Sequence, residues 1–335
     1  MSANPPGEPR PAIAVFSHGE LIGDALYKIP FVRALREAFP DAWLVWITTD
    51  ESALATRLRP LTAGLIDEFR SPCGMGTSPW QLLGPRFFDD HFQVFLDTQS
   101  VIWRTLMAKR IRHDLFISPA ANFRFSDRRP PLPYAKPAHI VDRLLDMLAL
   151  ACGHRPTLPE TLGLPLPADL EEKAARLLPP GPVYVALAPG AGGRIKCWPL
   201  DRFIELGRAI AARGWVPVYI VGPAEEEWLP AIRDGVPQAL FPEQATDVWG
   251  GEFTPLRTIA LARRCRMAVS NDSGISHMLG IADIPLLVLY GPTDATKFRP
   301  AVSRCRTLSA RDFGGPDMRF LPLDAVVGAL DGMVA

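Results

Sequence analysis

Apolar runs of strand length alternate with helical patterns along the first half of the chain. Residues 12–16 and 43–47 are uninterrupted apolar runs, and between them apolar side chains recur at helical spacing from Leu26 to Phe39. Further elements are predicted as strands at residues 92–96 and 114–117 and as helices at residues 101–110 and 139–151. Such alternation is typical of a doubly wound parallel sheet.

The alternation is interrupted once and then starts again. Seven prolines stand between Arg155 and Pro182, around one short polar helix at residues 168–178, which indicates an interdomain linker. Beyond it, strands are predicted at residues 183–188, 216–221, 267–270 and 285–290, with helices at residues 199–212, 224–233, 255–264 and 274–281.

These patterns divide the 335 residues into two Rossmann-like α/β domains, which is the number of cores that a chain of this length can fill. We predict a disordered leader at residues 1–11, an N-terminal domain at 12–155, the linker at 156–182 and a C-terminal domain at 183–335. The ligand site is expected in an interdomain cleft that faces the carboxyl ends of the strands.

Composition narrows the class of protein but names no partner. The chain is 48% hydrophobic and 21% charged with a net charge of zero, as in an ordinary globular protein. Its five cysteines form neither a C-x-x-C pair nor a cluster at zinc spacing, so we expect no metal site and a reduced, cytoplasmic compartment. Because no apolar run approaches the ~20 residues of a membrane span, any membrane contact is expected to be peripheral.

The most informative segment is 271–277, where a predicted strand passes into a helix. The hydroxyl of Ser273 and the free backbone N–H groups around Asp272 and Gly274 can hold a phosphate at the positive end of the helix dipole. The competing interpretation is that Asp272 or Ser273 only caps the helix. His277 follows one turn later, either to orient this loop or as a hydrogen-bonded core histidine.

Two further segments of the second half suit a nucleotide diphosphate. In the segment 189–199, Gly190 and Gly192 allow the backbone to approach phosphates closely, and Lys196 can neutralise the charge of a leaving group. The alternative is that this segment is an ordinary loop without a ligand. The spacing is neither that of a P-loop nor that of a dinucleotide fingerprint. Glu225 follows the next strand and can accept the hydroxyls of a ribose, or it is a solvated first-turn glutamate.

In the first half, residues 17–24 join the first strand to the first helix. Asp24 stands where a carboxylate can take a proton from an acceptor hydroxyl, and it could equally be the N-cap of the helix. His18 and Glu20 remain alternative bases. Downstream, residues 101–138 carry eight Lys and Arg, Arg104 and Arg124 among them, against two acids. This excess suits an anionic acceptor or an anionic membrane face, or it is a solvated surface.

Together these segments resemble the bacterial heptosyltransferases, glycosyltransferase family nine, over nearly the whole chain. The matching segments are Gly23-Asp24 with Pro30, residues 95–100, 139–143, 189–199, 222–225 and 272–277, and Gly291-Pro292-Thr293.

The resemblance implies the GT-B arrangement of two Rossmann-like domains and an inverting, metal-independent transfer from a nucleotide diphosphate sugar. Asp24 matches the catalytic base and Lys196 the diphosphate lysine. Glu225 matches the ribose position, and the Asp272–Gly274 segment matches the loop that meets the donor phosphates. Gly23 falls beside the base, on the acceptor side. The expected co-substrate is a nucleotide sugar such as ADP-heptose, with no other cofactor, and the expected acceptor is a glycan or glycolipid of the lipopolysaccharide type.

Other classes fit less well. A dehydrogenase needs a glycine fingerprint after a strand, and a hydrolase of the α/β type needs a G-x-S-x-G elbow, and neither is present. Nothing in the sequence indicates a nucleic-acid partner. The remaining rival is a catalytically silent relative that binds nucleotide sugars as a scaffold, and retention of both Asp24 and Lys196 argues against it.

Overall fold

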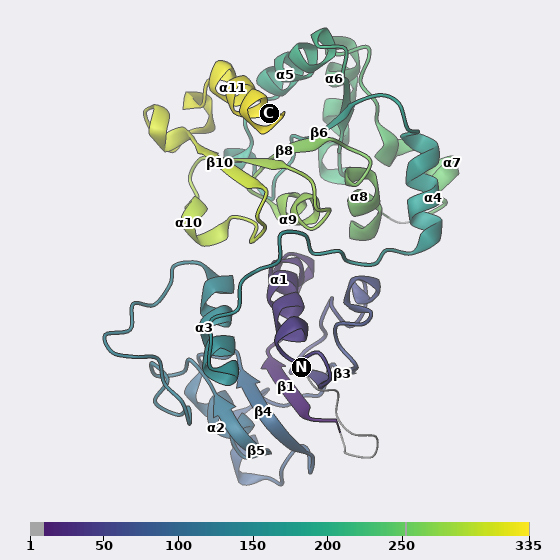
Figure 1. Ribbon diagram of the computed structural model, residues 1–335. Helices are drawn as coiled ribbons and strands as arrows, with labels where there is room; N and C mark the ends of the chain where they lie inside the picture. Colours follow the sequence, from purple (N-terminus) through teal and green to yellow (C-terminus); the bar gives the residue numbers. More distant parts are fainter. Residues whose placement is uncertain (1–9, 252, 335) are drawn as a thin grey trace. The chain divides into compact units, whose positions relative to one another are not determined.

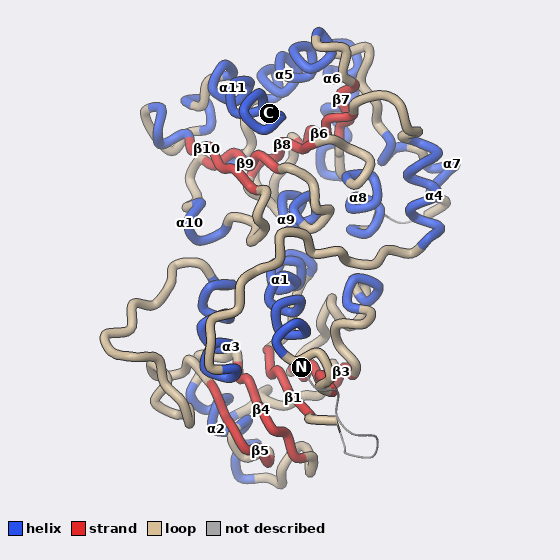
Figure 2. The backbone as a smooth tube through the Cα atoms, viewed as in Figure 1, coloured by secondary structure: helices blue, strands red, loops and turns tan. Residues whose placement is uncertain are grey.

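The computed structural model describes residues 10–251 and 253–334, and it divides the chain into two compact units, residues 1–159 and 160–335. Each unit is built on a five-stranded parallel sheet (Figures 1 and 2). Residues 1–9 of the predicted leader lie outside the described residues. Arg10 and Pro11 are bonded to the residues at the start of the second strand: the Arg10 side chain donates to the carbonyl oxygens of Asp41 and Ala42, and the Pro11 carbonyl accepts the backbone N–H of Trp43.

The N-terminal sheet has the order β3-β2-β1-β4-β5. Its elements are β1 (Ala12–Ser17), α1 (Ile22–Ala38), β2 (Trp43–Thr48), η1 (Arg59–Thr62), β3 (Glu68–Arg70), η2 (Pro79–Leu83), β4 (His91–Asp97), α2 (Ile102–Ala108), β5 (Arg112–Ile117) and α3 (Ile140–Cys152), where η denotes a 3-10 helix. From β1 the chain continues through β2 to β3 at one edge of the sheet, and it then returns to β4 and continues to β5 at the other edge. The loops after β1 and β4 therefore flank the point where ligands bind in such sheets.

The C-terminal sheet repeats this plan with the order β10-β9-β8-β6-β7. Its strands are β6 (Tyr184–Ala188), β7 (Val216–Tyr219), β8 (Met267–Asn271), β9 (Leu286–Tyr290) and β10 (Cys305–Ser309). Its α-helices are α4 (Ala168–Leu177), α5 (Leu200–Ala212), α6 (Leu229–Gly235), α7 (Thr246–Trp249), α8 (Pro255–Ala262), α9 (Gly274–Gly280), α10 (Ala295–Phe298) and α11 (Leu323–Val334). Short 3-10 helices are η3 (Arg194–Lys196), η4 (Pro223–Trp228), η5 (Pro242–Gln244), η6 (Ala310–Phe313) and η7 (Met318–Phe320). Here the order reverses between β6 and β8.

Each domain has its own apolar core. In the N-terminal domain, Phe16, Phe95, Phe116 and Met107 are buried in one cluster that joins the sheet to α2. In the C-terminal domain, fully buried Trp198 packs with α5, α11 and the strands. Two separate cores explain why the apolar pattern is interrupted once along the sequence.

The structure differs from the sequence-based expectation in several places. The edge strands β3 and β10 and the helices α7, α10 and α11 were not predicted. The helix predicted at 224–233 is η4 followed by α6, because Pro230 stands in the first turn of α6. Much of the segment predicted as a linker packs on the C-terminal domain, where the carboxylate of Asp283 accepts the backbone N–H groups of Leu162 and Gly163. Among the described residues, no helix is long and apolar enough to span a bilayer.

Candidate active site

Four loops of the C-terminal domain come together because they follow four neighbouring parallel strands. Gly190 lies after β6, Glu225 after β7, Asp272 after β8 and Thr293 after β9. Asn271 fixes the loop after β6 at both ends: its amide donates to the Pro189 carbonyl at 2.7 Å and its Oδ1 accepts the Trp198 backbone N–H at 3.0 Å. The segment between those two anchors carries Gly190 and Lys196.

Lys196 is held against the loop after β8. Its ammonium lies 3.2 Å from Oδ2 of Asp272, which also accepts the hydroxyl of Thr293 at 2.6 Å. The Asp272 side chain is 8% exposed and that of Lys196 is 35% exposed, so the carboxylate is covered while the lysine side chain is partly exposed. Lys196 can therefore meet an anionic ligand without leaving Asp272. Thr293 is a site residue that the sequence motifs placed in the family pattern but gave no role.

Ser273 occupies the N-cap position of α9 but does not cap it. Its side chain makes no capping hydrogen bond, and its Oγ is buried with no hydrogen-bond partner among the described residues. Asp272 is engaged by Lys196 and Thr293 instead. Capping therefore does not account for either side chain, and the Ser273 hydroxyl has hydrogen-bonding capacity that the described residues do not use. Gly274 begins α9, and His277 lies one turn further on.

Glu225 is covered by the two glycine loops on either side of it. A Cβ added at Gly190 would lie 2.6 Å from its Cδ, and one added at Gly222 would lie 3.2 Å from its Oε2. Burial raises the pKa of Glu225, against the opposing charge of Arg194. The expectation of a solvated glutamate is wrong for Glu225, which is buried, whereas Glu226 and Glu227 are exposed.

Gly192, the second glycine predicted to approach phosphates, has a different environment. A Cβ added at Gly192 meets nothing within 4 Å, so the protein itself does not require glycine there. Nearby, the guanidinium of Arg194 stacks 4.1 Å above the Trp228 ring and pairs with Glu227 at 2.6 Å. These contacts close the outer side of the loop against η4.

Asp24 lies in the first turn of α1 in the N-terminal domain, and its side chain is exposed. The N-cap of α1 is Leu21, so the N-cap interpretation of Asp24 is wrong. Beside it is a hollow of about 490 Å³ lined by residues 20–23 and by Glu51, Ala53, Thr56 and Arg57. A carboxylate at a helix N-terminus next to a solvent-filled hollow is well placed to meet a hydroxyl.

Glu20, one of the alternative bases, is held in a buried ion pair inside the domain. Its side chain is fully buried and its Oε1 accepts the Lys28 ammonium at 2.8 Å, while the same ammonium donates to Ser17 Oγ at 2.7 Å. Burial alone would raise the pKa of Glu20, but the Lys28 charge and the hydrogen bonds outweigh it and lower that pKa. Such a carboxylate is a poor base. Sequence reasoning missed Lys28, one helical turn beyond Asp24.

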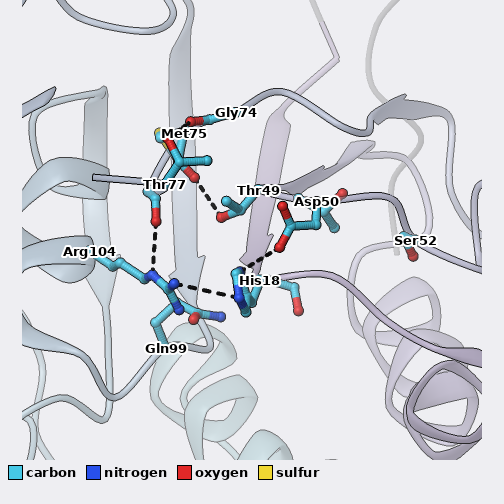
Figure 3. Close-up of polar contacts among 12 residues, drawn as sticks. His18, Thr49, Asp50, Ser52, Gly74, Met75, Thr77, Gln99 and Arg104 are labelled. Carbon is cyan, nitrogen blue, oxygen red and sulfur yellow. Dashed lines mark hydrogen bonds and ion pairs between the residues drawn. The ribbon is translucent and has the colours of Figure 1, made fainter. Parts of the chain in front are cut away.

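His18 stands between an acid and a base (Figure 3). Its Nδ1 lies 3.4 Å from Oδ2 of Asp50, and its Nε2 lies 3.5 Å from Nη2 of Arg104. Arg104 is itself anchored, because its Nε donates to the Gly76 carbonyl at 3.0 Å. Since a guanidinium only donates, this geometry suits an imidazole with its Nε2 unprotonated. The loops after β1 and β2 and the start of α2 thus meet at one edge of the sheet.

Asp97 ends β4 beneath this edge and is completely buried. Its Oδ2 accepts the hydroxyls of Thr105 at 2.6 Å and Ser118 at 2.8 Å, and its Oδ1 accepts the backbone N–H of Gln99 at 2.9 Å. Burial raises its pKa to about 6, although these hydrogen bonds oppose the shift. Asp97 therefore joins β4, α2 and β5 and fixes the loop that bears Gln99. Asp97 belongs to the segment 95–100 that resembles the family, but nothing in the sequence indicated that its carboxyl group is buried.

The remaining predicted acceptor residues lie apart from one another. Gly23 lines the hollow beside Asp24, and Arg104 belongs to the His18 cluster. Arg124 is exposed in the loop after β5, where its carbonyl accepts a hydrogen bond from Arg129. In the part of the chain that the structure describes, no three His, Cys, Asp or Glu residues gather as a metal site would require.

The chain is similar to known proteins over most of its length. A family model described as glycosyltransferase family 9 (heptosyltransferase) matches residues 91–319. Lipopolysaccharide heptosyltransferase 1 of Pseudomonas aeruginosa is 23% identical over 309 residues, which cover 87% of this chain and 82% of that protein.

Solved structures show the same two-domain architecture. A glycosyl transferase family 9 protein from Veillonella parvula superimposes with a TM-score of 0.72 at 17% identity, covering 97% of each chain. The Escherichia coli heptosyltransferase WaaC with ADP gives a TM-score of 0.67 at 18% identity, covering 96% of this chain and 99% of that one. The predicted fold class, a GT-B pair of Rossmann-like domains, is confirmed.

Proposed function

The chain belongs to glycosyltransferase family 9, the heptosyltransferases, and on that premise we propose that it transfers a heptose from ADP-heptose to a hydroxyl of a lipopolysaccharide-type acceptor. The proposed transfer inverts the anomeric centre and needs no metal ion. The names of its relatives motivate the substrates, because the Pseudomonas protein is a lipopolysaccharide heptosyltransferase and the Escherichia coli structure contains ADP.

The observation that carries the proposal is the group of side chains after β6, β7, β8 and β9. Lys196 presents an ammonium on a partly exposed side chain, Ser273 a hydroxyl without a hydrogen-bond partner in the described chain, and Glu225 a carboxylate against a glycine backbone. A nucleoside diphosphate has the complementary groups: a diphosphate for Lys196 and Ser273, and ribose hydroxyls that can donate to Glu225.

In the proposed reaction the acceptor oxygen forms a bond to the anomeric carbon while the bond from that carbon to the diphosphate oxygen breaks. Asp24 takes the proton of the acceptor hydroxyl during the attack. Lys196 stabilises the negative charge that the departing diphosphate gains, which is the part that a metal ion plays in other transferases. Attack from the face opposite the leaving group inverts the configuration.

The acceptor is proposed to bind the N-terminal domain. The hollow next to Gly23 adjoins the base, and Arg104 with His18 offers polar contacts at the same end of the sheet. Since lipopolysaccharide precursors are built on a lipid, we place the protein in the cytoplasm with peripheral contact to the inner membrane. A catalytically silent nucleotide-sugar binder remains the alternative that the following experiment excludes or establishes.

The test is a transfer assay with the purified full chain, ADP-heptose and a lipopolysaccharide-precursor acceptor, in buffer with EDTA and in buffer with Mg²⁺. We expect ADP release that depends on acceptor, equal rates in both buffers, and a product of inverted anomeric configuration by NMR. Binding of ADP-heptose without turnover would establish the silent binder. Loss of activity in EDTA that Mg²⁺ restores would refute metal independence.

The base is tested by replacing Asp24 with Asn. We expect Asp24→Asn to keep ADP affinity and to lose about a hundred- to ten-thousandfold in kcat, the usual contribution of a general base. His18→Ala is the comparison, because His18 is the other base that the sequence left open and, unlike Glu20, it is not buried in an ion pair. A deeper loss of kcat in His18→Ala than in Asp24→Asn would move the base to the histidine.

A further inference from the structure

A rigid apolar surface protrudes from the N-terminal domain on η2 and α2. Trp80 is 79% exposed and Leu83 is 83% exposed, although both belong to ordered structure. Their neighbour Leu82 instead packs against the domain core. Two large apolar side chains held outward on one short helix are unusual enough to require an explanation.

The polar groups of this segment hold it in place. Ser78 and Gln81 form a capping box, and the Gln81 amide also donates to the Gly74 carbonyl at 2.9 Å. The guanidinium of Arg110 donates to the carbonyl oxygens of Gln81, Leu82 and Gly84. Because the backbone is tied from both sides, Trp80 and Leu83 do not become exposed by local unfolding. They are exposed in the folded state.

Helix α2 extends the same surface. Ile102 is 48% exposed and Leu106 is 38% exposed, and their four-residue spacing puts them on one face of the helix. Arg110 follows Leu106 by a further turn and bonds to η2, so this face adjoins η2. Trp80, Leu83, Ile102 and Leu106 are called the apolar surface below.

The charges around the apolar surface are mainly positive. Residues 71–112 contain five Lys and Arg against three acids. Of the acids, Asp97 is buried, Asp90 is paired with Arg70 at 2.7 Å and Asp89 is exposed. Of the bases, Lys109 is paired with Asp127 at 3.1 Å. Arg86, three residues after Leu83, is exposed. The surroundings thus favour an anionic partner.

We propose that the apolar surface docks the N-terminal domain onto an anionic lipid bilayer, with Trp80 and Leu83 inserted at the headgroup level and Arg86 against the lipid phosphates. Tryptophan and leucine flanked by arginine is the composition of interfacial membrane anchors. A stable protein partner would need about 800 Å² on each side, and four side chains fall short of that. The inference rests on the proposed function in one respect, because a lipid-borne acceptor would be met at this membrane.

The experiment is co-sedimentation of the full chain with vesicles of phosphatidylethanolamine and phosphatidylglycerol, without donor or acceptor, and with phosphatidylcholine vesicles for comparison. The double variant Trp80→Ser/Leu83→Ser should bind the anionic vesicles at least about tenfold more weakly than the wild type, because the loss of one large apolar side chain from the bilayer weakens binding by about that factor. Arg86→Gln should lose roughly fivefold.

Leu132 provides a matched control, because it is 83% exposed in the same domain and lies outside the apolar surface. Leu132→Ser should bind vesicles as the wild type does. Brominated lipids should quench part of the wild-type tryptophan fluorescence, and Trp80→Phe should remove that quenching. Equal binding by the double variant and the wild type, or an equal loss in Leu132→Ser, would overturn the proposal. A wild-type dimer that the double variant no longer forms, without vesicle binding, would assign the surface to a second copy of the chain and also overturn it.

Failure of docking and failure of the proposed function give different results. If the function is correct and docking occurs, the double variant keeps its rate on a delipidated, soluble acceptor and loses rate on vesicle-borne acceptor. Vesicle binding without any sugar transfer would leave docking intact and refute the function. Transfer to vesicle-borne acceptor at an unchanged rate in the double variant would refute docking and leave the function intact.

Discussion

Substitution of Asp97 by Asn should remove a specific pH dependence of stability. Burial raises the pKa of Asp97 from 3.8 to about 6. The folded protein therefore binds this proton more tightly than the unfolded chain does. The contribution of Asp97 to the free energy of unfolding is greatest below pH 3.8 and falls as pH rises towards 6, after which it is constant.

The size of the effect follows from the shift. Each pKa unit corresponds to about 1.4 kcal/mol, so ionisation of Asp97 costs the folded state about 3 kcal/mol in all. Asn cannot titrate, and its amide can replace the proton because the hydroxyls of Thr105 and Ser118 can rotate to accept from it. The stability of Asp97→Asn relative to the wild type should therefore rise by about 2 kcal/mol between pH 4 and pH 7, and the rest of the effect lies below pH 4.

Urea unfolding followed by circular dichroism measures this difference. Because the chain has two domains, two transitions are fitted, and only the transition of the N-terminal domain should change. Asp89→Asn, at an exposed position, provides the reference curve. Stability curves of Asp97→Asn and wild type that run parallel from pH 4 to pH 7 would show that Asp97 does not carry a raised pKa.

Three further predictions concern the substrate sites. Lys196→Ala should lower kcat on the order of a hundredfold and raise the KM for the nucleotide sugar, because it removes the charge that meets the diphosphate; full activity in steady-state assays would contradict this role. Gly190→Ala should raise the donor KM about tenfold, since the new Cβ displaces the Glu225 carboxylate, whereas Gly193→Ala should match the wild type because a Cβ there meets nothing within 4 Å. Arg124→Glu should raise acceptor KM several-fold if the basic segment binds an anionic acceptor, and an unchanged KM at low salt would remove this residue from the acceptor site.

The sequence alone determined the architecture and the order of the chemical groups. The buried strands β1, β2, β6, β8 and β9 consist mainly of apolar residues, so each is visible as an apolar run with a loop after it. In a parallel sheet those loops share one edge. This is why Asp24, Lys196, Glu225 and Ser273 could all be placed at carboxyl ends of strands from their positions in the sequence.

Tertiary structure decided which of those side chains are available. Glu20 and Asp24 are four residues apart and look equally suited to be a base, but Lys28 buries one in an ion pair while the other remains exposed. Glu225 becomes buried because Gly190 leaves space for its carboxylate. Contacts of this kind join residues far apart in the chain or on different turns.

Two of the four edge strands, β3 and β10, show the same limit, whereas the edge strands β5 and β7 were predicted. β3 and β10 are strands because each pairs with a neighbour on one side, and neither has the apolar run that marks a buried strand. The spacing of apolar residues indicates which face of a segment is buried. The pairing of an edge strand, the protonation of Asp97 and the hydrogen bonding of Ser273 depend instead on the segments that pack beside them. The sequence therefore determines the sheets and their loops, and only the folded chain determines which loop side chains are free to act.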